Sequence, residues 1–190
     1  MKIFKIFVVI LLVFSVPMYS YSQQNICDTT LAKKGSDVVY YKQPPHFYYS
    51  HLPAIGEIVN KLPYGAILVT PGSNIFYYDG IYYQVLNEIF KVILAPKGTQ
   101  IYLLPYGAKK IKIDNKLYYY YFGTFYTISI DGSFIVVNAP IGAKVNALPC
   151  GYKTLKKDNK YYYIFDHTLY EEILTEDNEI IYLVLKHNIQ

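Results

Sequence analysis

Arginine and tryptophan are absent from this 190-residue chain, and cysteine occurs only twice. All 18 basic residues are therefore lysines. Proteins that bind guanine or phosphate through two hydrogen bonds usually use arginine for this contact. Because the lysines also form no dense run, we expect no nucleic-acid partner. Two cysteines can make neither a disulfide scaffold nor, on their own, a four-ligand zinc site. The sequence predicts no metal site and no cofactor.

Long apolar runs are missing from the chain except at its N-terminus. There the segment Ile6–Val16 is apolar apart from one serine, and it follows a basic start and precedes Pro17, Ser20 and Ser22. This order of basic, apolar and small residues is typical of a secretory signal peptide, here residues 1–22. The run is shorter than the roughly 20 residues that a membrane span needs, although an uncleaved N-terminal anchor is the alternative. We expect an exported protein, periplasmic or extracellular, with no transmembrane span after removal of the signal.

Internal repetition is the strongest feature of the sequence. Residues 91–128 and 134–173 align without a gap, and an earlier copy begins near residue 51. Each copy places a Leu-Pro-x-Gly turn before a tyrosine-rich segment. The equivalent turns are Leu62–Gly65, Leu104–Gly107 and Leu148–Gly151. The repetition predicts three similar structural units.

The pattern inside a unit predicts short antiparallel strands. Lys110–Ile113 alternates lysine with isoleucine, as a half-buried strand does. Asp114-Asn115 and Asp131-Gly132 are the dipeptides that tight hairpins favour. No later segment carries a long apolar stripe of helical period. We therefore predict an all-β fold of tandem small antiparallel units, either barrels like those of Src-homology-3 domains or packed meanders.

The repeats also predict the domain organisation. We expect a signal peptide over residues 1–22 and an N-terminal extension over 23–50, packed along the first unit. Three β units should follow at 51–90, 91–133 and 134–190. In the last unit, Glu179–Leu185 should supply a closing strand in the place that Ser133–Val137 holds for the preceding unit.

Two resemblances rest on the repeated motifs. The order of Gly98-Thr99-Gln100-Ile101, the Leu-Pro-Tyr-Gly turn and Gly123-Thr124-Phe125-Tyr126 resembles bacterial Src-homology-3-like modules. More closely, residues 51–173 resemble an uncharacterised domain-of-unknown-function family of exported, tyrosine-rich bacterial proteins with tandem Pro-x-Gly, Leu-Pro-x-Gly and Tyr-Tyr-x-x-Gly-x-Tyr-Tyr elements. The third copy departs from this pattern, because His167 stands where the other copies have a turn glycine. The resemblance implies fold and location only, with no activity.

Residues capable of chemistry are few, and each has a structural interpretation. Cys27 and Cys150 could form one disulfide in an oxidising compartment, but Cys150 could equally be a small buried residue. Asp79 and Asp166 occupy equivalent positions before a turn, where a carboxylate pair could support acid–base catalysis. Aspartate beside a hairpin turn is, however, expected for backbone reasons alone. The four histidines show no metal-binding spacing. We assign no catalytic residue and do not expect an enzyme.

The tyrosines offer the main candidate for binding. Along the aromatic strand of each unit, alternate positions face opposite ways. One set, aromatic in every copy, should face the core. The other set includes Tyr77, Tyr118, Tyr120 and Tyr162, and a solvated face of this kind would display a row of tyrosines to a ligand. The alternative is that neighbouring units or a dimer cover this face.

Two functions follow from these patterns. The first is a non-enzymatic binding or structural module of the cell envelope, which presents tyrosine-rich strands to glycan, peptidoglycan or a protein partner; a homo-oligomer is compatible with it. The second is a small secreted hydrolase with a site between units. The hydrolase requires convergent polar groups in a cleft, whereas the module requires only an aromatic surface.

Overall fold

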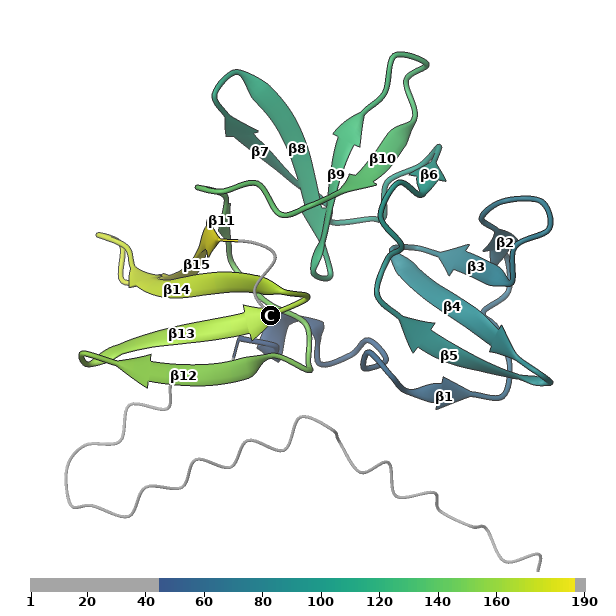
Figure 1. Cartoon of the computed structure of the whole chain (residues 1–190), viewed down its shortest axis with the longest axis horizontal. Coiled ribbons are helices and arrows are strands. Elements are labelled where there is room, and N and C mark those ends of the chain that lie inside the picture. Colours follow the sequence, from purple (N-terminus) through teal and green to yellow (C-terminus); the bar gives the residue numbers. More distant parts are fainter. Residues whose placement is uncertain (1–44, 187–190) are drawn as a thin grey trace, which may run out of the picture.

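The computed structural model describes residues 45–186, which form three five-stranded antiparallel sheets (Figure 1). One short 3-10 turn, η1 (Phe47–Tyr49), is the only helical element among these residues. The predicted all-β, antiparallel architecture is confirmed. None of the three sheets closes into a barrel, because the two end strands of each sheet do not pair with each other. The units are therefore open meanders and not barrels of the Src-homology-3 kind.

The three sheets repeat one strand order. The first comprises β1 (Ile58–Val59), β2 (Ile67–Leu68), β3 (Ile75–Tyr78), β4 (Ile81–Leu86) and β5 (Ile89–Ile93). The second comprises β6 (Gln100–Ile101), β7 (Lys109–Ile113), β8 (Lys116–Tyr121), β9 (Thr124–Ile128) and β10 (Phe134–Val137). The third comprises β11 (Lys144–Val145), β12 (Lys153–Lys157), β13 (Lys160–Phe165), β14 (Thr168–Leu174) and β15 (Ile180–Lys186). In each sheet the last four strands form a meander and the short first strand pairs with the last one.

The sheets place the unit boundaries later than the sequence analysis did. Strand β5 contains Lys91, the residue expected to open the second unit, and pairs with both β4 and β1 in the first sheet. Strand β10 closes the second sheet, as expected for Ser133–Val137, so the second unit extends past the boundary placed at residue 133. The repeat alignment could not settle this point, because a periodic sequence fixes the length of the repeat but not where its hydrogen-bonded unit begins. The predicted closing strand near residues 179–185 is present as β15, in the place that β10 holds in the second sheet.

Two-residue turns join the central strands of each unit. Asp114 and Asn115, between β7 and β8, have φ values of 45° and 64°, the left-handed conformation that type I′ hairpin turns require at both positions. The turns between the two aromatic strands of each unit have the same form, and we call these turns the hairpin tips. They are Asp79-Gly80, Phe122-Gly123 and Asp166-His167. Phe122 and His167 thus adopt a conformation that large side chains rarely take.

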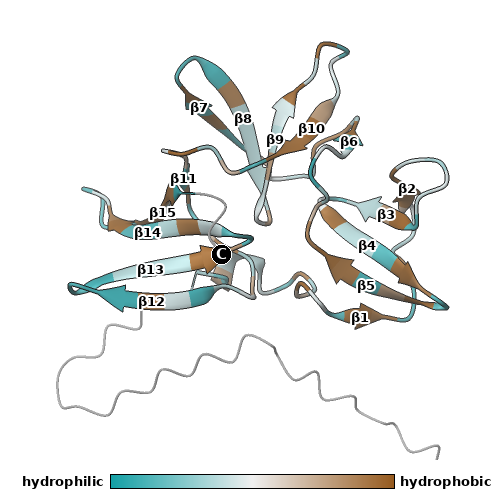
Figure 2. Ribbon diagram, viewed as in Figure 1, coloured by the Kyte–Doolittle hydropathy of each residue, from teal (hydrophilic) through white to brown (hydrophobic). Residues whose placement is uncertain are grey.

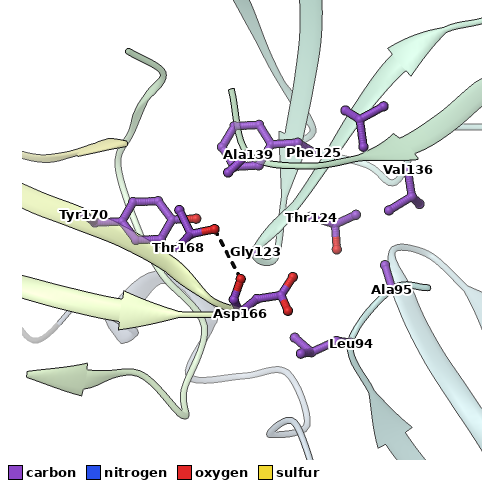
Figure 3. Close-up of a pocket in the computed structure, with 11 residues that line it drawn as sticks. Leu94, Ala95, Gly123, Thr124, Phe125, Val136, Ala139, Asp166, Thr168 and Tyr170 are labelled. Carbon is purple, nitrogen blue, oxygen red and sulfur yellow. Dashed lines mark hydrogen bonds between the residues drawn. The ribbon is translucent and has the colours of Figure 1, made fainter. Parts of the chain in front are cut away.

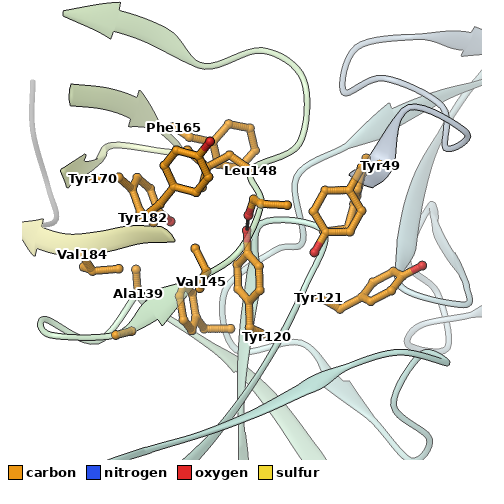
Figure 4. Close-up of a cluster of buried hydrophobic side chains, with 14 of the residues drawn as sticks. Tyr49, Tyr120, Tyr121, Ala139, Val145, Leu148, Phe165, Tyr170, Tyr182 and Val184 are labelled. Carbon is orange, nitrogen blue, oxygen red and sulfur yellow. Dashed lines mark hydrogen bonds between the residues drawn. The ribbon is translucent and has the colours of Figure 1, made fainter. Parts of the chain in front are cut away.

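The units pack around a shared aromatic core (Figure 4). This cluster includes Tyr83 of the first unit, Tyr120 of the second and Tyr170 of the third. The Tyr120 hydroxyl donates to the backbone carbonyl of Ala147 at 2.6 Å, inside the core. Burial of the large rings supplies the apolar area that holds the three units together.

The hydroxyls of two buried tyrosines, Tyr120 in this cluster and Tyr126 in a second, smaller cluster, allow a direct test of the packing. Tyr120→Phe leaves the buried Ala147 carbonyl without its donor, and we expect a loss of about 1–3 kcal/mol in unfolding free energy. The Tyr126 hydroxyl is buried near Tyr82 and Thr124 but makes no hydrogen bond of good geometry among the described residues, so Tyr126→Phe should cost less stability than Tyr120→Phe. Urea unfolding of both variants measures the difference. Equal losses would contradict the assignment of the hydrogen bond.

The segment before the first sheet packs against the second and third units. Tyr49 makes edge-to-face contacts with the rings of Tyr121 and Phe122, with centroid distances of 5.9 and 5.3 Å. The Pro45 carbonyl accepts a hydrogen bond from the Leu148 backbone N–H at 3.0 Å. The expectation that the N-terminal extension lies along the first unit is therefore not met by its described part. Tyr49 instead fills the space beside the buried Phe122.

Strand β12 forms one edge of the third sheet. Strand β12 is exposed along its whole length and largely hydrophilic (Figure 2), with three lysines that protect an open sheet edge from pairing with other chains. Within residues 45–186, no helix has the length and apolar character that crossing a membrane requires.

Candidate functional site

The structure separates the four tyrosines that the sequence assigned to a ligand surface. Tyr118 on β8 and Tyr162 on β13 are half-buried, so part of each ring reaches solvent. Tyr77 and Tyr120 are buried, and Tyr120 is 0% exposed. The exposure expected for Tyr77 and Tyr120 is therefore wrong. The alternative, that a neighbouring unit covers the face, describes these two positions.

Both buried tyrosines reach across to the next unit in the same way. The Tyr77 hydroxyl donates to the Leu103 carbonyl at 3.2 Å, as the Tyr120 hydroxyl does to the Ala147 carbonyl. Leu103 and Ala147 each precede the Leu-Pro of the following unit's turn. Sequence periodicity could not find these contacts, because they join one repeat to the next and not two strands of one repeat.

The hairpin tips complete the two junctions. A Cβ atom on Gly80 would lie 2.6 Å from Cε1 of Tyr121, and one on Gly123 would lie 2.5 Å from Cε1 of Phe165. Pro105 and Pro149, from the Leu-Pro turns, close the same space at 3.0 and 2.8 Å. At these two tips glycine suits the positive φ, and the close approach of the next unit leaves no room for a side chain.

Asp79 adds a polar contact at the first junction. Its carboxylate accepts a hydrogen bond from the Tyr106 backbone N–H at 2.9 Å. Asp79 therefore has a structural role between units, whereas the sequence interpretation considered only its own turn. Phe122 takes the equivalent place at the second junction and packs against Tyr49 instead.

The most exposed tyrosines lie elsewhere, on the Leu-Pro-Tyr-Gly turns. Tyr64 and Tyr106 are 101% and 92% exposed, while the backbone of each turn is closed by a hydrogen bond from Ala66 or Ala108 to the turn proline's carbonyl. The sequence analysis treated these residues only as turn markers. Their position between proline and glycine was the available signal, since a side chain at the apex of a turn projects away from both strands.

A small cleft lies where the three units meet (Figure 3). Leu94 and Ala95 from the first unit's end, Thr124 on β9 and Val136 on β10 line it together with Asp166. The Thr168 hydroxyl donates to the backbone carbonyl of Asp166 at 3.2 Å. Asp166 is exposed overall, but partial burial of its carboxyl in the cleft raises the pKa of that group above its usual value. The cleft therefore carries one carboxyl group with apolar neighbours.

The other candidate residues are dispersed. Nδ1 of His46 lies 3.0 Å from the Tyr152 hydroxyl, and burial lowers the pKa of this histidine. His51, which follows η1 in the sequence, is exposed. His187 lies outside the described residues. Residues 45–186 contain no group of three or more histidine, cysteine, aspartate or glutamate side chains that could hold a metal ion. The Cys27–Cys150 disulfide stays a prediction, since Cys27 lies outside the described residues.

Comparison with known proteins identifies a family. The model of a family described as "Family of unknown function (DUF6515)" matches residues 14–188. No curated protein and no solved structure matches the chain.

Proposed function

We propose that this chain, which belongs to the DUF6515 family of unknown function, is a non-enzymatic binding or structural module of the cell envelope. It presents tyrosine-bearing turns and strands to glycan, peptidoglycan or a protein partner. The observation that carries the proposal is the exposure of Tyr64 and Tyr106 on two equivalent, hydrogen-bonded turns. The compartment rests on the signal-like residues 1–22, from which we infer a mature chain that starts near Gln23.

The exposed tyrosines contribute little to the fold and much to a potential contact surface. Each ring leaves its unit at a fixed place, because a glycine and a proline shape the turn that bears it. A tyrosine combines a large apolar face with a hydroxyl group, at low entropic cost on binding. Such rings stack on the apolar faces of sugar rings, and peptidoglycan and other envelope glycans offer these faces in repeating rows.

Two lysines lie opposite half-buried tyrosines on the sheets. Lys110 of strand β7 pairs with Tyr119 of β8. Lys156 of strand β12 pairs with Tyr161 of β13, and its Nζ lies 5.2 Å from the centre of the Tyr161 ring. Cationic side chains beside aromatic rings favour polymers that carry negative charge as well as sugar rings.

The test is co-sedimentation with isolated cell-wall sacculi. The double variant Tyr64→Ser and Tyr106→Ser should bind at least about tenfold more weakly, because each truncated anchor costs more than about 1 kcal/mol. Its thermal stability should match that of the unmodified chain, since both rings are exposed. The matched control is Ile130→Ser, which removes a fully exposed apolar side chain from another turn and should leave binding unchanged. Unchanged binding by the tyrosine variant, or equal weakening by the control, contradicts the proposal.

The second candidate function is a hydrolase, with the cleft at Asp166 as its site. The raised pKa of this carboxyl suits a general acid, but glycoside hydrolysis usually employs a second carboxyl group. The same sacculus incubation distinguishes the two functions. Release of soluble fragments that Asp166→Asn abolishes supports the hydrolase, and binding without release supports the module.

A further inference from the structure

Each junction between units consists of a donor half and an acceptor half. The donor half is a hairpin tip with the sequence Tyr-Tyr-Asp-Gly (residues 77–80) or Tyr-Tyr-Phe-Gly (residues 120–123). Its first tyrosine binds a carbonyl of the next unit, and its glycine admits that unit's aromatic ring and proline. The acceptor half is the Leu-Pro turn of the next unit together with the second aromatic column of its strand, which is Tyr121 or Phe165.

The first unit has the acceptor half without a donor. Tyr78 is 40% exposed, whereas its equivalents Tyr121 and Phe165, each covered by the preceding hairpin tip, are 7% and 4% exposed. The groups that would complete the polar contacts are the Lys61 carbonyl and the Tyr64 backbone N–H, by analogy with Leu103 and Tyr106. Within residues 45–186 neither group has a hydrogen bond.

The third unit has the donor half in an altered form. Its tip reads Ile-Phe-Asp-His over residues 164–167, so the donating tyrosine is Ile164 and the glycine is His167. These are the two positions that reach into the next unit at both internal junctions. A side chain at His167 would place atoms where the acceptor's aromatic ring and proline lie, because even a Cβ at Gly80 or Gly123 approaches them within 3.0 Å.

We propose that the Leu62–Gly65 turn and Tyr78 form a docking site for another protein chain that presents a β-hairpin with a Tyr-x-Asp-Gly tip, and that Ile164 and His167 prevent a second copy of this chain from occupying it. The occupant is defined by continuity with the two internal junctions, since the site repeats an acceptor that is filled twice in the same molecule. The tyrosine hydroxyl of the partner binds the Lys61 carbonyl, its aspartate binds the Tyr64 N–H, and its glycine lies against Tyr78. The inference is independent of glycan binding, which uses the Tyr64 side chain and not its backbone.

The experiment restores the donor half of a junction at the hairpin tip of the third unit. The variant Ile164→Tyr, His167→Gly and Tyr78→Ala carries a restored tip and a damaged acceptor, so it can only donate. Mixed with the unmodified chain, it should form a 1:1 complex in sedimentation velocity, while each protein alone remains monomeric. Asn159→Gly in place of His167→Gly is the matched control, because it puts glycine in the other tight turn of the same unit, also at positive φ. This control mixture should remain monomeric.

Three results would overturn the proposal. The first is the absence of a complex when both proteins have native circular dichroism. The second is a complex that persists when the unmodified chain is replaced by its Tyr78→Ala form, because docking would then not use this site. The third is head-to-tail association of the unmodified chain alone, which would show that His167 does not block the tip. If the triple variant is unfolded, His167→Gly with Tyr78→Ala serves as the donor, since glycine suits the φ of 55° at this position.

Discussion

Gly123→Ala should destabilise the protein strongly. Two costs combine at this position. The φ of 80° disfavours any side chain by about 1–2 kcal/mol, and the new methyl group would lie 2.5 Å from the Phe165 ring and 2.8 Å from Pro149. Forcing an extra methyl group into a packed region costs about 1–3 kcal/mol more. We expect a total loss of about 2–5 kcal/mol in unfolding free energy.

The control for this prediction lies in the same unit. Gly132 has a φ of 83° in a hairpin turn, but a Cβ there would meet nothing within 4 Å. Gly132→Ala should therefore show the backbone cost alone. Urea unfolding of the two variants separates backbone strain from the junction between units. If both lose the same free energy, the close contact between the second and third units is not as the structure has it.

Alkaline unfolding should be unusually cooperative for this protein. Within residues 45–186, burial raises the pKa of ten tyrosines, namely Tyr49, Tyr77, Tyr82, Tyr83, Tyr120, Tyr121, Tyr126, Tyr163, Tyr170 and Tyr182. In the unfolded chain these phenols ionise near their ordinary pKa of about 10. Because the folded pKa lies above the unfolded value, the stabilisation is complete below about pH 10 and is lost as the pH rises towards the folded pKa.

The expected magnitude is large because several protons leave together. Each phenol that stays protonated only in the folded state removes about 1.4 kcal/mol of stability per pH unit above about pH 10. The fully buried Tyr120, Tyr126 and Tyr170 alone make this a steep dependence. Phenolate absorbance and near-ultraviolet circular dichroism, followed together against pH, should show a late absorbance step that coincides with unfolding. Gradual ionisation of all the tyrosines with the circular dichroism unchanged would contradict the burial of these rings.

Features that depend on neighbouring residues were predictable from the sequence, whereas features that depend on contacts between distant residues were not. Turn positions such as Asp114-Asn115 were predictable, because a left-handed backbone leaves a local signature in residue type. The closing strand β15 was predictable from the repeat. The boundaries between units were not, since hydrogen bonding across the repeat decides which strand completes each sheet.

The tyrosines that the structure exposes differ from those that the sequence predicted, for the same reason. Alternation along the strand correctly distinguished two faces, but it contains no information on whether another unit covers one of them. Tyr77 and Tyr120 are buried by contacts with residues 26 and 27 positions away, at Leu103 and Ala147. The most exposed tyrosines proved to be Tyr64 and Tyr106, which belong to turns and not to the aromatic strands.

By itself, the sequence determined that this protein is an antiparallel β protein of three repeated units, because strand alternation and turn chemistry are local properties of neighbouring residues. It also contained the two exceptions in the third unit, Ile164 and His167, without indicating their purpose. Only the tertiary structure decided which tyrosines lie in the core, why glycine occupies two of the three hairpin tips, and where the first unit leaves an acceptor uncovered. These are contacts between repeats, and they depend on how the three units pack against one another, which no pattern within a single repeat specifies.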